Sequence, residues 1–175
     1  MLQAVDWHNL TVRTGRKLCA QALTAIGIAE GEARAEAEII LRYITALSAY
    51  ELILHGDQRL SGEQVERVRD ILEERFKRVP LQYILGHTFF MGLEFEVGHG
   101  VLIPRADTET LVSACAQYIE KNLGGQGRLL EVGAGSGAIV ISLLKQFPAL
   151  QATAFEISPA AVAICLSNAY KHGVA

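Results

Sequence analysis

The residues best suited to chemistry lie in the segment Leu129–Ile141, which reads LLEVGAGSGAIVI. Three glycines at alternate positions, Gly133, Gly135 and Gly137, separate an apolar run from residues that recur at helical spacing. Glycine is needed where the backbone takes a positive φ or approaches a ligand closely. The pattern therefore predicts a buried strand, a tight turn and a helix start, with a cofactor lying against the turn.

Two acidic residues narrow the choice of cofactor. Glu156 follows the first glycine by about 20 residues, the spacing at which an acid binds ribose hydroxyls in dinucleotide-binding folds. Gly133, Gly135 and Ala138 also fit the GxGxxG/A form of that fingerprint. Glu131 would repel a pyrophosphate but attract the amino group and sulfonium of S-adenosylmethionine. The residues favour this methyl donor, with a dinucleotide or a turn used only for helix packing as alternatives.

The elements around these residues alternate between strand and helix. Ser158 is a predicted N-cap, and proline follows it at the first helical position. Such a βαβα unit belongs to a parallel sheet covered by helices. A doubly wound sheet has more strands than this chain supplies, so we expect the chain to be the N-terminal part of a longer protein. The predicted strands span 128–132 and 152–157, and the predicted helices span 137–147 and 158–172.

The first 79 residues have apolar positions at helical spacing. Ser48 with Glu51 and Ser61 with Gln64 fit capping boxes, which mark two helix starts. The charged residues are expected to form a solvated outer face without a catalytic cluster. The pattern predicts a four-helix bundle with helices over 11–26, 30–47, 48–54 and 61–79.

After Pro80 the apolar residues alternate with period 2. They predict a strand over 89–97, a turn over 98–100 and a second strand over 101–103, followed by a helix capped by Asp107 or Thr108 that ends at 124–125. We therefore predict an α/β protein with three parts. A helical domain over 1–79 precedes a β-hairpin linker over 80–104 and the first part of a Rossmann-like domain over 105–175.

Composition limits the function further. The chain has 16 basic and 19 acidic residues and a net charge of −3, so nonspecific nucleic-acid binding is not expected. Its three cysteines are dispersed without a CxxC pair, which favours a reducing compartment and no metal site. No apolar run of membrane-spanning length or signal peptide occurs, so we expect a cytoplasmic protein. Arg13, Arg16 and Lys17 on a predicted helix leave an organellar transit peptide as the alternative.

Four segments closely resemble, in order and spacing, the HemK/PrmC family of protein glutamine N5-methyltransferases. The PLQYILG, FxGLxF and IPRxxTE parts of these segments are more specific than the glycine turn. The preceding helical segment is also similar to the N-terminal domain of that family. The segments are RVPLQYILGHTFFMGLEFEV (78–97), VLIPRADTETLV (101–112), LLEVGAGSGAIVISLL (129–144) and AFEISPAAVAICLSNA (154–169).

The resemblance implies a class I enzyme that uses S-adenosylmethionine to methylate the glutamine of the GGQ motif in peptide chain release factors. It implies that the helical domain recognises this substrate and that the protein is a monomer without a metal ion. Glu131 would lie near the methionine amino group of the cofactor, and Glu156 would bind its ribose. The implied cofactor loop consists of Gly133, Ala134, Gly135, Ser136 and Gly137.

The resemblance also implies a substrate side of the site. Phe89 or Phe90 would face the sulfonium, because an aromatic ring attracts a cation. Arg105, Thr108 and Glu109 match the IPRxxTE segment and would shape the same cleft. The alternatives are that Thr108 is only a helix cap and Phe89 only a core residue.

The sequence departs from the family pattern at two places. Ala106 stands where the family commonly has proline after Arg105, and the NPPY motif is absent because the chain ends before its place. That motif orients the substrate amide, so we assign no catalytic residue and expect the 175 residues alone to be inactive. An amino-methylating DNA or RNA enzyme and a noncatalytic binding module are the alternative functions.

Overall fold

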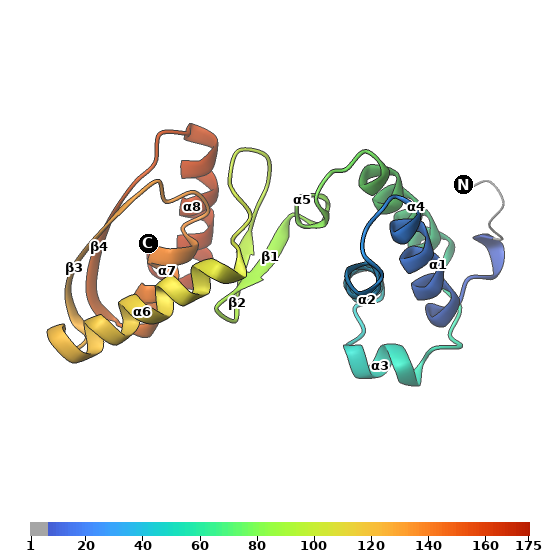
Figure 1. The fold of residues 1–175 in the computed structure, drawn as a ribbon, viewed down its shortest axis with the longest axis horizontal. Helices are drawn as coiled ribbons and strands as arrows, with labels where there is room; N and C mark the ends of the chain where they lie inside the picture. The colour runs from blue at the N-terminus through green and yellow to red at the C-terminus, as the bar shows by residue number, and fades with distance from the viewer. Residues whose placement is uncertain (1–6) are drawn as a thin grey trace. The chain divides into compact units, whose positions relative to one another are not determined.

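The computed structural model describes residues 7–175, which form two compact units divided between Leu85 and Gly86. The described part of the first unit is helical (Figure 1). The helices predicted over 11–26, 30–47, 48–54 and 61–79 are confirmed, and a short fifth helix lies where the sequence predicted the start of a linker. The elements are the 3-10 turn η2 Trp7–Asn9 and the helices α1 Val12–Ala25, α2 Glu30–Thr45, α3 Ala49–Leu54, α4 Gly62–Phe76 and α5 Leu81–Leu85.

Local side-chain hydrogen bonds begin α3 and α4. The Glu51 N–H donates to Ser48 Oγ at 3.3 Å, and the Ser48 N–H donates to the Glu51 carboxylate at 2.8 Å. Ser61 and Gln64 form the same pair of bonds at the start of α4, at 3.2 and 2.9 Å. Both predicted capping boxes are therefore confirmed, and each such cap stabilises its helix by about 1 kcal/mol.

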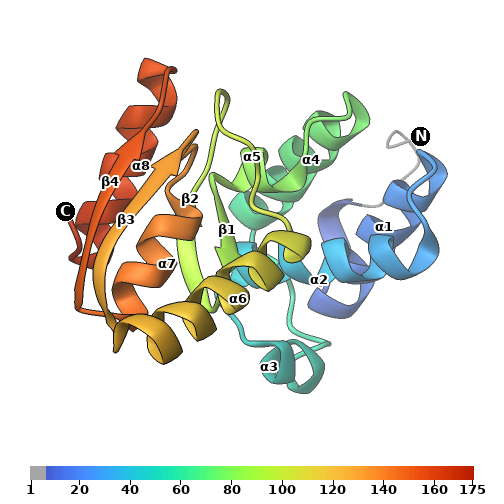
Figure 2. The same ribbon diagram turned by 60° about the vertical axis from the view of Figure 1, so that its left-hand side comes forward.

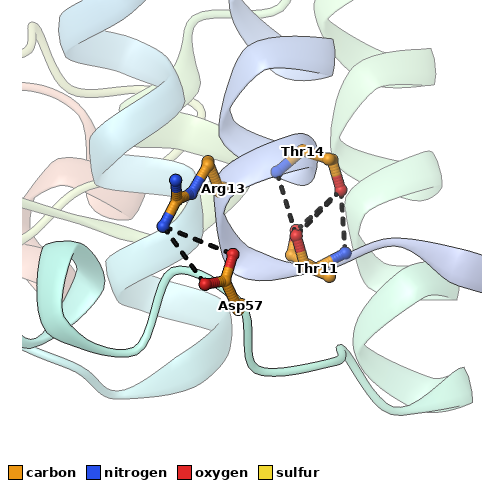
Figure 3. Close-up of polar contacts among 4 residues, drawn as sticks. All are labelled: Thr11, Arg13, Thr14 and Asp57. Carbon is orange, nitrogen blue, oxygen red and sulfur yellow. Dashed lines mark hydrogen bonds and ion pairs between the residues drawn. The ribbon is translucent and has the colours of Figure 1, made fainter.

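The start of α1 is attached to the loop that follows α3 (Figure 3). Thr11 and Thr14 form a further capping box, with N–H to Oγ1 distances of 2.8 and 3.2 Å. The Arg13 guanidinium lies 3.3 Å from the Asp57 carboxylate, and the Arg13 N–H donates to the Gly56 carbonyl at 2.8 Å. A Cβ at position 56 would lie 3.1 Å from the guanidinium nitrogens. A side chain at position 56 would therefore require a small shift of the Arg13 guanidinium.

The core of the helical unit contains a charged pair as well as aliphatic side chains. Arg75 on α4 is 8% exposed, and its Nε and Nη2 each donate to the Glu36 carboxylate on α2 at 2.9 Å. Its Nη1 donates to the Val79 carbonyl at 2.7 Å. The predicted solvated face therefore excludes these two residues, because bidentate pairing satisfies both charges inside the unit. The largest buried apolar residues of this core are Leu23, Ile40, Leu41, Ile71 and Leu72.

The second unit begins with an antiparallel hairpin of β1 His87–Phe90 and β2 Leu93–Glu96. The turn consists of Met91 and Gly92, whose φ values of 50° and 74° are typical of a two-residue type I′ turn. Phe90 lies opposite Leu93 in the register. The hairpin predicted within 80–104 is therefore present.

The predicted position of the turn was wrong. The chain turns within the strand predicted over 89–97, and 97–103 contains no strand. Consecutive phenylalanines at 89 and 90 let the alternation be read in either phase across the turn. Met-Gly is also a weaker turn signal than the Gly-His-Gly sequence at 98–100, so the sequence favoured the later position.

The rest of the second unit is the predicted βαβα arrangement preceded by a helix. Strands β3 and β4 pair in parallel from Gln126 opposite Ala149 to Val132 opposite Phe155, and Figure 2 shows them side by side. The first helix begins two or three residues earlier than expected with Arg105 as its N-cap, so the predicted caps, Asp107 and Thr108, lie inside it. The elements are α6 Ala106–Leu123, β3 Gln126–Val132, α7 Ala138–Gln146, β4 Ala149–Phe155 and α8 Pro159–His172.

The two faces of the β3–β4 sheet differ. Helices α6 and α7 lie on one side of it (Figure 1), and their apolar side chains share a core with Phe90 and Phe95 of the hairpin. On the other face Leu130, Val132 and Phe155 are exposed. A helical unit followed by a hairpin and by the start of a Rossmann-like domain is the predicted α/β fold. Within residues 7–175, no helix combines the length and apolar character needed to cross a membrane.

Candidate functional site

The glycine loop connects the carboxyl end of β3 to the start of α7. Gly133, Gly135 and Gly137 have φ values of 78°, 55° and 78°, a region that L side chains rarely adopt, as their spacing predicts. Gly137 is also the N-cap of α7, and its N–H donates to the Ala134 carbonyl at 2.8 Å. Ser136 is buried, so the loop is folded back against the unit and does not project into solvent.

Gly137 additionally has no room for a side chain. A Cβ there would lie 2.8 Å from Cys165 Sγ on α8 and 2.8 Å from Ile141 Cδ1 on α7. Gly133 and Gly135, by contrast, face open space. The first two glycines therefore leave the loop surface open to a ligand, and the third lets α7 pack closely on α8.

Glu131 lies on the helix-covered side of β3, two residues before the loop. Its carboxylate accepts the Val140 N–H in the first turn of α7 at 3.0 Å. Burial raises the pKa of Glu131 to about 7, and the Val140 hydrogen bond opposes that shift. The carboxylate is therefore costly to keep ionised here, and a nearby cation would favour its charged form.

Glu156 follows β4 and holds the loop from the other side. One carboxylate oxygen accepts the Gly135 N–H at 2.8 Å, and the other accepts the N–H groups of Ile157 and Ser158 at 2.8 and 2.9 Å. These backbone hydrogen bonds, led by the one from Ser158, lower the pKa of Glu156. Glu156 is thus ionised at neutral pH and lies directly beside the glycine loop.

The two phenylalanines of the hairpin occupy different environments. Phe90 is 2% exposed and contacts Phe95 edge-on, with ring centroids 6.2 Å apart. Phe89 is 65% exposed, on the opposite side of the strand. Phe90 is therefore a core residue, and Phe89 is the ring that faces solvent.

The IPRxxTE residues act on the hairpin through one contact. The Glu109 carboxylate on α6 accepts the Met91 N–H at the hairpin turn, at 2.7 Å. Thr108 is partly buried in the first turn of α6, and its N–H donates to the Arg105 carbonyl at 3.0 Å. Arg105 itself is exposed. Of these three residues, Glu109 is the one that fixes the turn beside Phe89.

Two further residues at this edge were missed by the sequence analysis. Asn168 on α8 is fully buried and bonds to both Glu96 and Ser136. Its place on the face of α8 that carries Ala161 and Cys165 was the available signal, because a polar residue there must find buried partners. Ile157, directly after Glu156, is 97% exposed, an unusual exposure for a large apolar side chain.

The elements that meet at this edge can hold a small ligand that carries both a cation and hydroxyl groups. Glu131 and Glu156 supply carboxylates on the two sides of the glycine loop, and Ile157 supplies an apolar surface. The segment before α6 also lies here, because a Cβ added to Gly100 would lie 3.4 Å from the Cβ of Ala160 at the start of α8. Within 7–175, no cluster of His, Cys, Asp and Glu side chains suits a metal ion.

Comparison with known proteins identifies the family. Residues 16–86 match the family model of the PrmC N-terminal domain. The release factor glutamine methyltransferase of Geobacter sulfurreducens is 39% identical over 141 residues, which are 81% of this chain and 48% of that protein. Residues 16–86 thus belong to the family of the PrmC N-terminal domain. The similarity to the release factor glutamine methyltransferase extends beyond the helical unit into the unit that carries the glycine loop.

Other relatives agree. The release factor glutamine methyltransferase of Dictyoglomus turgidum is 36% identical over 79% of this chain and 48% of its own length. The bifunctional methyltransferase of Rickettsia felis is 33% identical over 87% of this chain and 33% of its own length. The chain thus spans about half the length of the first two HemK/PrmC relatives and about a third of the bifunctional one.

Proposed function

We propose that this protein methylates the side-chain amide of the glutamine in the GGQ motif of peptide chain release factors, with S-adenosylmethionine as the methyl donor. The observation that carries the proposal is Glu131, a partly buried acid beside a glycine loop, whose pKa is raised to about 7. A ligand with an amino group and a sulfonium supplies the positive charge that this acid lacks, whereas a pyrophosphate would add repulsion. The names of the relatives support the choice of substrate.

The residues of the loop fit the parts of this cofactor. Glu131 would accept the methionine amino group, and Glu156 retains lone pairs for ribose hydroxyls after accepting three backbone N–H groups. Exposed Ile157 would cover one face of the adenine ring. The open space above Gly133 and Gly135 would let the ligand approach the backbone closely.

The hairpin would serve the reacting groups. The sulfonium of the bound cofactor supplies an activated methyl group, and the glutamine amide nitrogen is the acceptor. Phe89 would present its exposed ring to the positive charge, while Glu109 holds the Met91 N–H and thereby the position of the turn. An amide nitrogen is a poor nucleophile, so the rate would depend mainly on how closely these residues align donor and acceptor.

The helical unit would contact the release factor. On α3 the large apolar residues Tyr50, Ile53 and Leu54 are 73%, 68% and 63% exposed, although Leu52 between them is buried. A short helix that presents adjacent apolar side chains to solvent is typical of a protein-binding surface. The names of the relatives support a release factor as the partner for this surface.

The remaining parts of the proposal follow from this activity. We expect a monomer that acts in the cytoplasm, where release factors are used. We expect nucleic acid not to be bound directly, because acidic residues outnumber basic ones by 19 to 16.

A methyl-transfer assay tests the proposal. The protein as purified from its own cells is incubated with tritiated S-adenosylmethionine and either a release factor, the same factor with the GGQ glutamine changed to alanine, or DNA. We expect label only in the unchanged release factor. Label in DNA, or none in any substrate, would contradict the proposal in favour of a nucleic-acid enzyme or a binding module, respectively.

A substitution then tests the role of Glu131. We expect Glu131→Ala to raise the KM for S-adenosylmethionine by about 10- to 100-fold, because the variant removes a charge-assisted contact to the cofactor. Glu120→Ala, an exposed acid on α6, is the matched control and should leave this KM unchanged. An unaltered KM in Glu131→Ala would remove Glu131 from the cofactor site.

A further inference from the structure

Asn168 on α8 binds two segments that are far apart in the sequence, the end of β2 and the glycine loop. Its Oδ1 accepts the Glu96 N–H at the end of β2 at 2.7 Å, and its Nδ2 donates to the Glu96 carbonyl at 3.0 Å. The same Nδ2 donates to the carbonyl of Ser136, in the glycine loop, at 2.9 Å. Asn168 is 0% exposed, so these contacts are shielded from water. Both donor hydrogens of the amide are used.

The partners of Asn168 are backbone groups, so the contact fixes peptide planes. The Ser136 carbonyl shares its peptide unit with the Gly137 N–H, which donates to the Ala134 carbonyl at 2.8 Å. Holding the Ser136 carbonyl therefore also orients the last peptide of the loop before α7. No side chain of the loop itself makes this contact.

The other end of the contact is the hairpin. Glu96 is the last residue of β2, and the next residue, Val97, donates its N–H to the Gly86 carbonyl at 3.0 Å. Through β2, the position of Asn168 is linked to the turn at Met91 and to the exposed ring of Phe89. The glycine loop and the hairpin are thus joined by one buried side chain.

We propose that Asn168 is a positioning residue that couples the glycine loop to the hairpin. The loop keeps its geometry only while β2 is in place, and β2 keeps its place only while the loop is folded. Such coupling is reciprocal, because the free energy by which an ordered loop stabilises β2 equals the free energy by which an ordered β2 stabilises the loop. The significance for methyl transfer rests on the proposed function, whereas the coupling itself concerns only the contacts of this chain.

Amide hydrogen exchange on the 175-residue chain without ligand tests the coupling. In Asn168→Ala, unsatisfied backbone groups should speed exchange about ten-fold or more at Gly135 and Gly137 in the loop and at Val97 beside the hairpin. The amides of β3 and β4 should change much less. A uniform increase across 86–175 would mean that Asn168 only stabilises the unit, and no increase would mean that it couples nothing.

Ser167→Ala is the matched control. Ser167 precedes Asn168 on α8, and its Oγ donates to the Glu96 carboxylate at 2.6 Å without touching the loop. We expect exchange at Gly135 and Gly137 to stay at the wild-type rate in this variant. Faster exchange in the loop would show that any contact between α8 and β2 has the same effect, against the specific role of Asn168.

A second perturbation does not require Asn168 to be changed. Gly92 in the hairpin turn has φ +74° and open space around it, so Gly92→Ala strains the turn without a clash. Coupling predicts exchange several-fold faster at Gly135 and Gly137 in this variant. Gly124→Ala, at a positive-φ glycine with open space after α6, applies a similar strain and should leave the loop unchanged. Equal effects of both variants, or none from Gly92→Ala, would overturn the proposal.

A titration with S-adenosylmethionine separates this inference from the proposed function. With the protein as the cell makes it, cofactor binding at the loop should slow exchange at Val97 in the wild type but not in Asn168→Ala. If the cofactor does not bind at all, the proposed function fails while the ligand-free results still decide the coupling. If it binds and slows exchange at the loop without affecting Val97 in the wild type, the coupling fails.

Discussion

Each of the two units contains an acid that is at least half-buried, and the surroundings of the two acids differ. Glu36 in the helical unit lies against Arg75, which donates two hydrogen bonds to it at 2.9 Å. Glu131 in the second unit has the Val140 N–H, and among residues 7–175 no cation is a cause of its pKa shift. The first acid is neutralised by its own unit, while the second is left in need of positive charge.

The difference indicates what each acid is for. The buried pair of Glu36 and Arg75 joins α2 to α4. Each charge is balanced by the other, so neither needs a ligand. A half-buried acid held only by a backbone N–H reduces the stability of its own unit at neutral pH, and such a cost is typical of binding sites. The Glu36–Arg75 pair therefore indicates a structural role in the helical unit, whereas Glu131 indicates a binding site at the edge of the second unit.

The largest effect is expected from breaking the pair in the scaffold. Glu36→Ala leaves the Arg75 guanidinium buried without its partner and should lower the free energy of unfolding by about 3–5 kcal/mol. The only tryptophan, Trp7, packs against this core, so urea unfolding followed by its fluorescence measures the effect. Glu30→Ala, which removes an exposed pair with Arg34, should cost at most about 0.5 kcal/mol. Equal effects of the two variants would contradict the comparison.

Gly137→Ala should have the next largest effect, in the second unit. The added Cβ meets Cys165 and Ile141 at 2.8 Å and the backbone stays at positive φ, so we expect a loss of about 2–4 kcal/mol. Hydrogen exchange of the β3 and β4 amides measures this loss. Gly133→Ala has the same backbone strain without the contacts and should lose less than half as much. If both variants lose the same amount, close packing of α7 on α8 is not the reason for Gly137.

Glu131→Gln should act in the opposite direction and depend on pH. The folded pKa of about 7 lies above the usual value of 4.5, so the stabilising contribution of Glu131 is full below about pH 4.5 and is lost as pH rises through 7. Glutamine keeps an acceptor for Val140 and does not titrate. Reduced for partial solvent screening, the gain at pH 8 is about 1–2 kcal/mol, and it should vanish near pH 4.

Glu156→Gln is the matched control for that experiment. Backbone hydrogen bonds lower the pKa of Glu156, so its contribution is present above the unfolded pKa and is lost as pH falls. This variant should therefore destabilise the second unit at pH 8, where Glu131→Gln stabilises it. Changes of the same sign in both variants would show that the two acids are not in different environments.

The smallest effect is expected from an exposed pair in the second unit. Lys171 lies 2.5 Å from the Glu94 carboxylate, and its hydrogen bond lowers the pKa of that group. Both side chains are more than 40% exposed, so Lys171→Met should cost less than about 1 kcal/mol at pH 7. The contribution is lost as pH falls below the usual carboxyl pKa and is weakened by salt. A larger loss of unfolding free energy would mean that this exposed pair contributes as much as the buried pair of Glu36 and Arg75, against the comparison.

The elements set by neighbouring residues were predictable from the sequence. The capping boxes at Ser48 and Ser61 need only residues three positions apart, and the parallel β3–β4 unit follows from periodicity and glycine spacing. The hairpin turn was misplaced because its signal, Met-Gly between two apolar runs, is weak and competes with stronger turn residues at 98–100. The local sequence pattern therefore predicted an element correctly where the pattern was consistent with only one interpretation.

Contacts between distant residues were not predictable in the same way. The partners of Asn168 are backbone groups at 96 and 136. Every residue has a backbone carbonyl, so the sequence does not indicate which ones a buried side chain will bind. The pairing of Glu36 with Arg75 joins residues 39 positions apart, and both resemble ordinary surface charges. The roles of Glu131 and Glu156 in cofactor binding remain predictions, although the structure places both beside the glycine loop.

The three hydrogen bonds of Glu156 have a consequence for the kinetics of association. Because they tie Gly135, Ile157 and Ser158 together in the ligand-free chain, the glycine loop loses its conformational entropy during folding and not during binding. A ligand would then meet a surface that is already in its final form. Its association should be a single step, with an observed rate that rises linearly with ligand concentration and does not level off at a loop-closing rate.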